Sequence, residues 1–177
     1  MAALLILLFL LAFTVIFTFV MATSLAGFVM TRVPYVRTRS RDVIEIISKT
    51  PISSSDVFFD LGSGDGRVVF LVENVTGARV KGFELTLWSH LWSRVKRFAK
   101  RSRAELVYGN FFKRDFSEAT VIYCYLYPNI MRMIGDKVLA ECKPGTKVIS
   151  RDFPISNLPE TISWRSTTGH SIYLYQI

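Results

Sequence analysis

The stretch Val57-Phe58-Phe59-Asp60-Leu61-Gly62-Ser63-Gly64-Asp65-Gly66 decides the fold of this 177-residue chain. Its first five residues are apolar except for Asp60 and predict a buried strand over 57–61. The alternating glycines predict a tight turn that a ligand can approach closely, and the apolar residues after it predict a helix over 67–73. A strand, a glycine-rich turn and a helix in this order are typical of a parallel sheet covered by helices.

The rest of the chain continues this alternation. Further strands are expected over 80–84, 105–108, 121–125 and 146–150, and further helices over 41–49, 87–101 and 128–142. Ser40 is a suitable N-cap for the helix 41–49. The buried side of that helix would carry Val43, Ile44, Ile46 and Ile47. Two last strands, 161–165 and 171–175, flank Thr167-Thr168-Gly169 and predict an antiparallel hairpin.

A long apolar segment, residues 2–30, precedes these elements and carries no charged side chain. About 20 apolar residues suffice to cross the hydrocarbon core of a bilayer, so we expect a transmembrane anchor over 1–31. A cleaved signal peptide is the alternative, with Ser24-Leu25-Ala26 as a passable cleavage site, but such a peptide has a positive n-region and a shorter apolar core. The predicted architecture is α/β: a Rossmann-like parallel sheet with an antiparallel C-terminal hairpin, preceded by one N-terminal transmembrane helix.

Arginines follow the apolar segment at positions 32, 37, 39 and 41, and no charged side chain precedes it. The positive-inside rule therefore predicts a single-pass membrane protein whose domain is cytoplasmic and whose anchor contacts membrane lipid. The net charge of +8 suits anionic lipid or nucleic acid, and the adjacent span favours lipid. Residues 32–55 are expected to form a linker, with Val33-Pro34-Tyr35-Val36 extended, and a pre-domain helix. The main domain would then be 56–177.

The glycine-rich turn sits where sheets of this kind bind ligands, at the carboxyl end of a strand. A P-loop would need a Gly-Lys-Ser/Thr ending, which is absent, and the dinucleotide fingerprint fails because Arg67 follows the last glycine. Asp60 places a carboxylate at the strand tip, which suits a cationic ligand such as S-adenosylmethionine, with its ammonium, sulfonium and no phosphate. Glu84, at the end of the next strand, can accept both ribose hydroxyls. A turn that binds no ligand is the remaining alternative.

The segments VFFDLGSGDGRVV, GFEL and GNFF, in this order, resemble motif I, the acidic strand-two motif and the adenine-side motif of class I (seven-stranded) methyltransferases. More specifically, DLGSGDGRVV with the apolar leader, VPYV, GFELTLW and GTKVISRDFPI is similar to the membrane-anchored protein lysine methyltransferases. Those enzymes modify the adenine nucleotide translocase and the c subunit of ATP synthase. The resemblance covers essentially the whole chain and implies S-adenosylmethionine as cofactor and a methyltransferase domain over 56–177.

The resemblance also implies roles for individual residues. The methionine end of the cofactor would be held by Asp60, Gly62, Gly64 and Asp65, in a turn completed by Ser63 and Gly66. Glu84 would hold the ribose, and the adenine would lie between Leu85 on one face and Asn110 with Phe111 on the other. Two departures from the relatives, Thr86 and Tyr127, affect the shape expected for the acceptor pocket. No metal is expected, because Cys124 and Cys142 form no metal-binding pattern.

The acceptor side is expected at Tyr125-Leu126-Tyr127-Pro128, which leaves the strand 121–125. Enzymes that methylate exocyclic amines of nucleic acids usually carry Asn/Asp-Pro-Pro-Tyr/Phe there, so a DNA or RNA substrate is disfavoured. Tyr125 and Tyr127 are the candidate acceptor-pocket residues, and packing of either side chain in the core or at the strand edge is the alternative interpretation.

A lysine acceptor would have to lose its proton before it is methylated. With a free pKa near 10.4, only roughly one lysine in two thousand is neutral at pH 7, a cost of about 4–5 kcal/mol. An aromatic channel formed by Phe111, Phe112, Tyr125 and Tyr127 would lower that pKa by desolvating the ammonium. No general base stands out, because His90 and His170 are expected to be structural or exposed.

The expected helix 87–101 carries Trp88 and Trp92 together with several lysines and arginines. We expect its tryptophans to pack on the sheet and its basic face to lie in water, with contact between that basic face and lipid head groups as the alternative. The leading hypothesis for the whole chain is a protein lysine N-methyltransferase that acts on a membrane-associated protein. The alternatives are a methyltransferase of a small or lipidic molecule at the membrane and a non-catalytic, cofactor-binding regulator.

Overall fold

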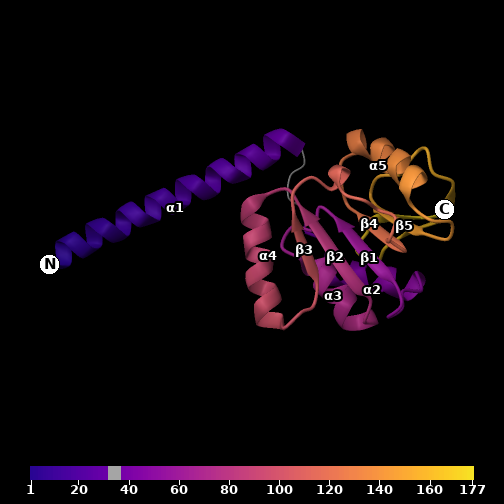
Figure 1. The fold of residues 1–177 in the computed structure, drawn as a ribbon, viewed down its shortest axis with the longest axis horizontal. Coiled ribbons are helices and arrows are strands. Elements are labelled where there is room, and N and C mark those ends of the chain that lie inside the picture. The colour runs from indigo at the N-terminus through magenta and orange to yellow at the C-terminus, as the bar shows by residue number, and fades with distance from the viewer. Residues whose placement is uncertain (32–36) are drawn as a thin grey trace.

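The computed structural model describes residues 1–31 and 37–177, without the side chains of residues 23–31 and of Glu160. Arg32 and the expected extended segment Val33-Pro34-Tyr35-Val36 lie outside the described residues. Helix α1 (Ala2–Thr31) projects away from a separate α/β domain (Figure 1). Its first 21 residues, Ala2–Ala22, are long and apolar enough to cross a membrane, and none of them is buried against the domain.

The domain is built on a seven-stranded sheet in the order β3-β2-β1-β4-β5-β7-β6. The strands are β1 (Val57–Leu61), β2 (Arg79–Glu84), β3 (Glu105–Tyr108), β4 (Val121–Cys124), β5 (Lys147–Arg151), β6 (Glu160–Arg165) and β7 (Ser171–Gln176). The first five are parallel, and β7 runs antiparallel to both β5 and β6. The predicted parallel sheet with a C-terminal hairpin is therefore confirmed. The chain order reverses between β1 and β4, the switch point where ligands bind in such sheets.

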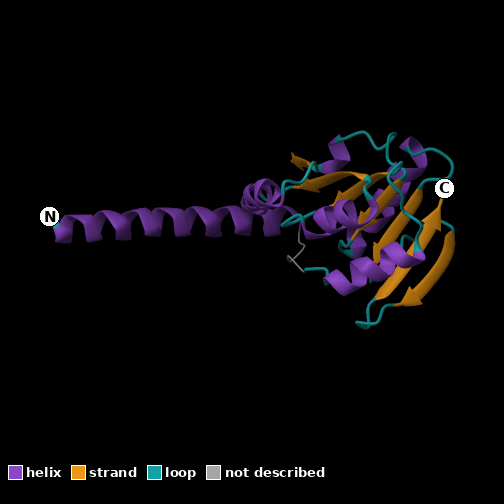
Figure 2. Cartoon of the chain, turned by 90° about the horizontal axis from the view of Figure 1, so that it is seen from below, coloured by secondary structure: helices purple, strands orange, loops and turns teal. Residues whose placement is uncertain are grey.

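Helices cover both faces of this sheet (Figure 2). They are α2 (Ser40–Lys49), α3 (Arg67–Thr76), α4 (Leu87–Lys100), α5 (Pro128–Glu141) and a 3-10 turn, η1 (Phe111–Lys113). Because side chains alternate along a strand, Phe58 packs with α2 and α3 on one face, whereas Phe59 and Leu61 pack with α5 on the other. No described residue of α1 belongs to either core cluster.

The expected elements are all present, with no end more than three residues from its expected position. The largest difference is α3, which continues to Thr76 because Gly77, with φ 71°, ends it in the left-handed conformation that glycine adopts readily. Ser40 was expected to cap α2, but Ser40 is its first helical residue, and the capping position is held by Arg39 without a side-chain hydrogen bond. Ile44, expected on the buried side, is 52% exposed, because Val43 and Ile46 already fill the contact with the sheet.

Candidate active site

The turn after β1 brings backbone groups to the switch point. Gly62, Gly64 and Gly66 have φ values of 83°, 54° and 78°, which side chains with a Cβ rarely adopt. The amide groups of Gly62 and Ser63 both donate hydrogen bonds of 2.9 Å to the carbonyl of Phe83, so the turn is tied to the end of β2. The sequence motif therefore has the backbone conformation that its glycines predicted.

Two contacts explain why small residues are needed around this turn. A Cβ at Gly62 would lie 3.0 Å from Cδ2 of Leu126, so the turn is packed against the segment that follows β4. A Cβ at Gly82 would lie 2.7 Å from Oγ of Ser63 and 2.9 Å from Val69. Ser63 is thus buried against β2 as well as lying in the expected cofactor-binding turn.

Asp60, at the carboxyl end of β1, is the most perturbed acid of the site. Its side chain is 2% exposed, and its Oδ2 has no hydrogen-bond partner among the described residues. Burial, together with the nearby negative charges of Glu84 and Asp65, raises its pKa to about 8. A buried carboxyl with an unpaired oxygen and two acidic neighbours is a site for a cation, and the ammonium of S-adenosylmethionine fits that requirement.

Glu84 lies beside the same turn, as expected for the acid that holds the ribose. Its Oε2 accepts a 2.7 Å hydrogen bond from the amide of Gly64, and its Oε1 accepts one of 2.7 Å from the amide of Thr86. Each carboxylate oxygen has a further lone pair, so Glu84 can still accept two hydroxyl groups. The bond to Gly64 fixes the carboxylate relative to motif I.

Asp65 is held by a residue that the sequence analysis did not single out. Its Oδ2 lies 2.6 Å from Nζ of Lys96 in α4, and its Oδ1 accepts a 3.3 Å hydrogen bond from the amide of Arg67. The carboxylate of Asp65 is thus directed toward α4, although it was expected to bind the methionine end directly. The 31 residues that separate Asp65 from Lys96 left no local sequence signal for this pair.

The adenine-side residues follow β3, directly beside Glu84. Glu84 and Tyr108 are paired in the parallel register of β2 and β3, and the amide of Gly109 donates a 2.8 Å hydrogen bond to the carbonyl of Glu84. Oδ1 of Asn110 accepts a 2.9 Å hydrogen bond from the amide of Phe112 and so caps η1. The structure thus brings Asp60, Glu84, the partly exposed Leu85, Asn110 and Phe111 to the carboxyl ends of three adjacent strands.

The expected acceptor aromatics do not form one cluster. Phe111 and Phe112 pack against the α5 face of the sheet, with ring centroids 4.5 Å apart, whereas Tyr125 packs against the α2–α3 face. Tyr127 is 38% exposed and stacks on Phe153, with centroids 6.0 Å apart. Phe153, which sequence reasoning missed, therefore replaces Tyr125 as the aromatic neighbour of Tyr127.

Asp152, directly after β5, organises the region beside Tyr125. It adopts a left-handed backbone with φ 63°, and its Oδ2 lies 2.9 Å from Nδ1 of His170. Burial, followed by a hydrogen bond to Asp152, raises the pKa of the Tyr125 hydroxyl, which is therefore protonated at neutral pH. His90 is buried against Tyr108, and burial lowers its pKa. Both histidines thus have structural partners.

A matched pair of glycine substitutions tests the role of the turn. Gly62→Ala should weaken S-adenosylmethionine binding by about tenfold or more, because the methyl group is driven against Leu126 and the turn must shift. Gly145→Ala carries a similar backbone strain at φ 91°, with nothing within 4 Å of the new methyl group, and should leave the affinity unchanged. Each variant should lose about 1–2 kcal/mol of unfolding free energy. Calorimetric titration compares the two, and equal affinities would contradict the proposed role of the turn.

Comparisons with known proteins agree with this geometry. The ANTKMT methyltransferase domain matches residues 60–161 of the chain. A protein-lysine N-methyltransferase of Saccharolobus islandicus (strain REY15A) is 34% identical over 154 residues, which cover 82% of this chain and 94% of that relative. The adenine nucleotide translocase lysine N-methyltransferase of Mus musculus is 28% identical over 126 residues. That match covers 70% of this chain and 55% of the mouse protein, so the chain spans about half of its length.

A solved structure gives the same fold with a ligand bound. The RNA methyltransferase from Salinibacter ruber, in complex with S-adenosyl-L-homocysteine, superposes with a TM-score of 0.76 at 29% identity, over 80% of this chain and 94% of that one. S-adenosyl-L-homocysteine is the product left when S-adenosylmethionine has given up its methyl group. The family resemblance and the cofactor predicted from motif I are therefore confirmed, and this chain belongs to the ANTKMT methyltransferase domain family of S-adenosylmethionine-dependent methyltransferases.

Proposed function

We propose that this chain is a protein lysine N-methyltransferase that modifies a membrane-associated protein while α1 anchors it in the same membrane. The names of its relatives support the lysine acceptor, since they include a protein-lysine N-methyltransferase and lysine N-methyltransferases of the adenine nucleotide translocase and of the ATP synthase c subunit. The observation that carries the membrane assignment is α1, an apolar helix whose first 21 residues are not buried against the domain.

The chemistry sets out what the residues of this chain must do. When bound, S-adenosylmethionine would supply an electrophilic methyl group, which a neutral lysine nitrogen would attack in line with the carbon–sulfur bond while S-adenosyl-L-homocysteine leaves. The protein adds mainly position and a dry surrounding. Tyr127 and Phe153 form an aromatic pair beside the carboxyl ends of β4 and β5, where they can desolvate an incoming ammonium and lower its pKa. The protonated hydroxyl of Tyr125, held at Asp152, offers a fixed polar group for orienting the nitrogen.

The anchor limits where the active site can act. We propose an anchor over 1–31, a linker with the pre-domain helix over 32–55 and a methyltransferase domain over 56–177. The arginines that follow the anchor favour a domain on the cytoplasmic side of the membrane. Only residues 32–39 separate α1 from α2, so even an extended chain lifts the domain by no more than about 30 Å. A lysine near the lipid surface is therefore presented at a high effective concentration.

Two other substrates remain as outcomes of the test. The Salinibacter ruber neighbour is named as an RNA methyltransferase, and a small or lipidic molecule at the membrane is a further possibility. The segment Tyr125-Leu126-Tyr127-Pro128 lacks the Asn/Asp-Pro-Pro motif of nucleic-acid amine methylation, which favours a protein acceptor. Mass spectrometry of membrane protein, RNA and small-molecule fractions, with and without the gene, separates the three, and a change in none of them would indicate a non-catalytic regulator.

Removing residues 1–31 tests the role of the anchor. We expect S-adenosylmethionine affinity to be unchanged, because the expected cofactor-binding residues all lie between Asp60 and Phe111, whereas methylation of the membrane acceptor should fall by about tenfold or more. The readout is methyl-lysine on the acceptor in membranes, measured by mass spectrometry. An unrelated apolar span with the same orientation should restore it. Equal methylation by the truncated and full chains would favour a soluble acceptor instead.

A further inference from the structure

Helix α4 carries an apolar face that points away from the protein. Five large apolar side chains recur at the spacing of one helical face: Trp88, Leu91, Trp92, Val95 and Phe98. Their exposed fractions are 42%, 40%, 45%, 57% and 89%, in that order. We call these five residues the outer face of α4. The expectation that the tryptophans of this helix pack on the sheet was therefore wrong.

Small and polar side chains make the contact with the sheet instead. His90 and Ser93 are the buried residues of α4, and the ring of His90 lies 5.6 Å from that of Tyr108 in β3. Oγ of Ser93 donates a 2.7 Å hydrogen bond to the carbonyl of His90. An ordinary surface helix buries its apolar side and exposes its polar side, so α4 is turned the opposite way, and the side chains of its outer face are left 40–89% exposed.

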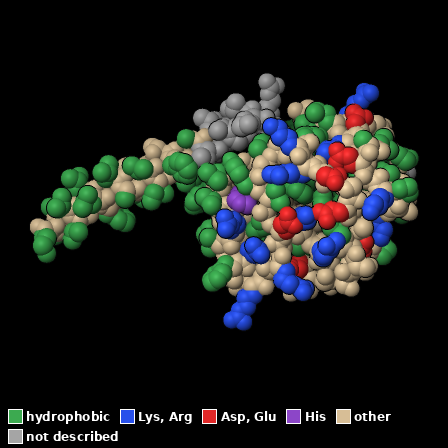
Figure 3. Space-filling model, in the orientation of Figure 1, with side chains coloured by type: hydrophobic (Ala, Val, Ile, Leu, Met, Phe, Trp, Pro, Cys, Tyr) green, Lys and Arg blue, Asp and Glu red, His purple; other side chains and the backbone are tan. Residues whose placement is uncertain are grey.

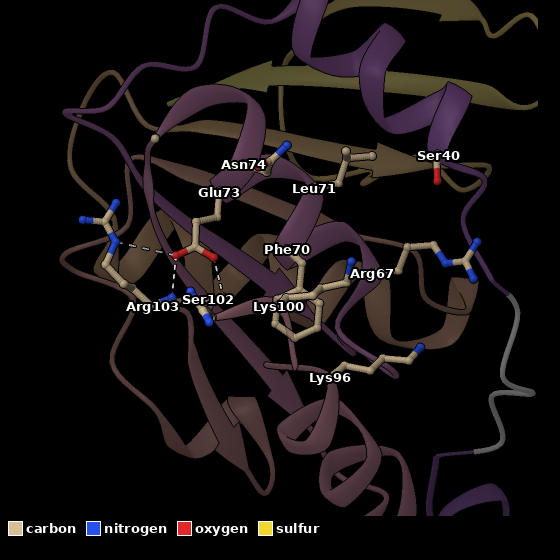
Figure 4. A pocket seen from close by; sticks show the side chains of 12 residues that line it. Ser40, Arg67, Phe70, Leu71, Glu73, Asn74, Lys96, Lys100, Ser102 and Arg103 are labelled. Carbon is tan, nitrogen blue, oxygen red and sulfur yellow. Dashed lines mark hydrogen bonds and ion pairs between the residues drawn. The ribbon is translucent and has the colours of Figure 1, made fainter. Parts of the chain in front are cut away.

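Cations border this face. Between α3 and α4 lies a cavity of about 840 Å³ lined by Arg67, Lys96, Lys100, Arg101 and Arg103 and by a single acid. That acid, Glu73, is occupied by hydrogen bonds from Ser102 and from the amide of Arg103, as Figure 4 shows. Two of the five cations have acidic partners, since Lys96 pairs with Asp65 and Nε of Arg103 lies 3.9 Å from Oε1 of Glu73. The other three, Arg67, Lys100 and Arg101, have no acidic partner among the described residues and are available to anions.

The position of α4 relative to α1 indicates which surface this side meets. The C-terminal end of α1 lies against α4 (Figure 1). In the same orientation, hydrophobic side chains gather on the side of the domain where α4 lies, with Lys and Arg next to them (Figure 3). A helix with Trp, Leu, Val and Phe on one face and Lys and Arg on its flanks has the composition of helices that lie in a membrane interface, where Trp is enriched.

We propose that α4 docks the domain on the surface of an anionic phospholipid bilayer, with its outer face in the interfacial layer and its flanking cations at the lipid phosphates. This inference rests on the proposed membrane anchoring by α1. It adds a second contact that would hold the domain in one orientation, with β3 toward the lipid. A second copy of this chain could cover the apolar side chains but would bring cations against cations, so an anionic bilayer is the better-matched occupant.

The three tryptophans of the chain allow a direct test. Trp88 and Trp92 lie on the outer face, whereas Trp164 lies in β6, at the opposite edge of the sheet. The full chain is reconstituted in lipid nanodiscs that contain phosphatidylglycerol and brominated acyl chains, which quench nearby tryptophans. In the variant Trp164→Phe, the fluorescence comes only from Trp88 and Trp92 on the outer face. Bromine should quench it several-fold more than the fluorescence of Trp164 in the double variant Trp88→Phe/Trp92→Phe. Omitting phosphatidylglycerol should reduce this difference.

A charged substitution on the outer face provides the second arm. Phe98→Asp, made in the Trp164→Phe background, should reduce the quenching, whereas Val75→Asp, at a half-exposed apolar position of α3, should leave it unchanged. Neither residue lies at the cofactor-binding turn, so S-adenosylmethionine affinity reports that each variant is folded.

The outcomes separate the docking from the proposed function. Equal quenching of the outer-face tryptophans and Trp164 in nanodisc-embedded chain overturns the docking while leaving the anchor intact. The docking is also overturned if the discs contain two chains each and bromine does not quench Trp88 and Trp92, because a dimer would then cover the outer face. Failure of the full chain to enter the discs overturns both the anchor and the docking. Strong quenching without any methylated lysine in cells supports the docking and rejects the proposed acceptor.

Discussion

Replacing Asp60 by Asn is expected to abolish S-adenosylmethionine binding and, at the same time, to stabilise the ligand-free protein. Removing one partner of a buried ionic contact costs about 3–5 kcal/mol, so affinity should fall by at least about 100-fold. The side chain is 2% exposed, and its Oδ2 is unpaired among the described residues, so this oxygen is available to a bound cation.

The gain in stability follows from the raised pKa of Asp60. The carboxyl has an ordinary pKa of 3.8 in the unfolded chain and a pKa of about 8 in the fold. Between these values the folded state keeps a proton that the unfolded state has released, so stability falls as the pH rises from about 4 to about 8. At pH 7 this loss is on the order of 4 kcal/mol. Asn has no proton to lose, but it leaves a buried amide only partly bonded, so we expect a net gain of about 1–3 kcal/mol.

Denaturant unfolding of the full chain in detergent, at pH 5 and at pH 8, checks this expectation. The advantage of Asp60→Asn over the unsubstituted protein should be small at pH 5 and largest at pH 8. Calorimetric titration in buffers of different ionisation enthalpy gives the second readout, because binding of S-adenosylmethionine at pH 7 should release close to one proton from Asp60. A stability difference that does not change with pH would mean that Asp60 is not held neutral in the fold.

If both effects are found, they have one physical cause, the burial of Asp60. A buried, unpaired carboxyl is a cost to the fold, and the cationic cofactor removes that cost when it binds. Glu84 and Asp65 strengthen the effect, since their charges raise the pKa of Asp60 in addition to burial. The ligand-free protein is thus less stable than its core would allow, in exchange for affinity toward a cation.

Local sequence patterns predicted most of this fold. The strand, turn and helix around Asp60 could be predicted because each glycine and each apolar residue acts on its own neighbours. The spacing in α4 showed which side chains share a face, but it could not show which face the sheet would receive. Periodicity is the same for both orientations, so Trp88 and Trp92 were placed on the wrong side.

Contacts between residues far apart in the sequence could not be predicted in the same way. Asp65 with Lys96 and Asp152 with His170 are brought together by the order of the strands, which no short motif specifies.

The prediction that Ser40 caps α2 was wrong for a local reason. Ser40 has the right chemistry for an N-cap, but the helix starts at Ser40 itself, one residue earlier than expected, and Arg39 holds the capping position.

One long-range contact should control the stability of the whole domain. Asp42 in α2 and Arg151 at the end of β5 are 0% and 1% exposed, and Oδ2 of Asp42 lies 2.7 Å from Nη2 of Arg151. Thr168, in the hairpin turn, donates a hydrogen bond to the other oxygen of Asp42. The guanidinium of Arg151 also lies 4.5 Å from the ring centroid of Tyr125. This pair therefore connects α2, the sheet, the hairpin turn and the ring of Tyr125.

Asp42→Leu should lower the unfolding free energy by about 3–5 kcal/mol, because it leaves the buried charge of Arg151 without a counterion. Nε and Nη1 of Arg151 already lack hydrogen-bond partners among the described residues, so the guanidinium has little else to compensate the loss. Arg151→Met should lower the unfolding free energy by a similar amount, because it leaves the carboxylate of Asp42 buried without its counterion. The double variant Asp42→Leu/Arg151→Met should recover much of the loss, since neither charge then has to be desolvated.

Denaturant unfolding of the four proteins forms a double-mutant cycle, and the coupling free energy should reach about 3 kcal/mol. Lys49→Gln is the matched control, because its exposed pair with Glu45 in the same helix should contribute less than about 1 kcal/mol. Single variants that cost no more than this control would mean that water reaches the pair. If the cycle holds, α2 is fixed to the sheet through a buried charge, by the same residue, Arg151, that lies over the ring of Tyr125.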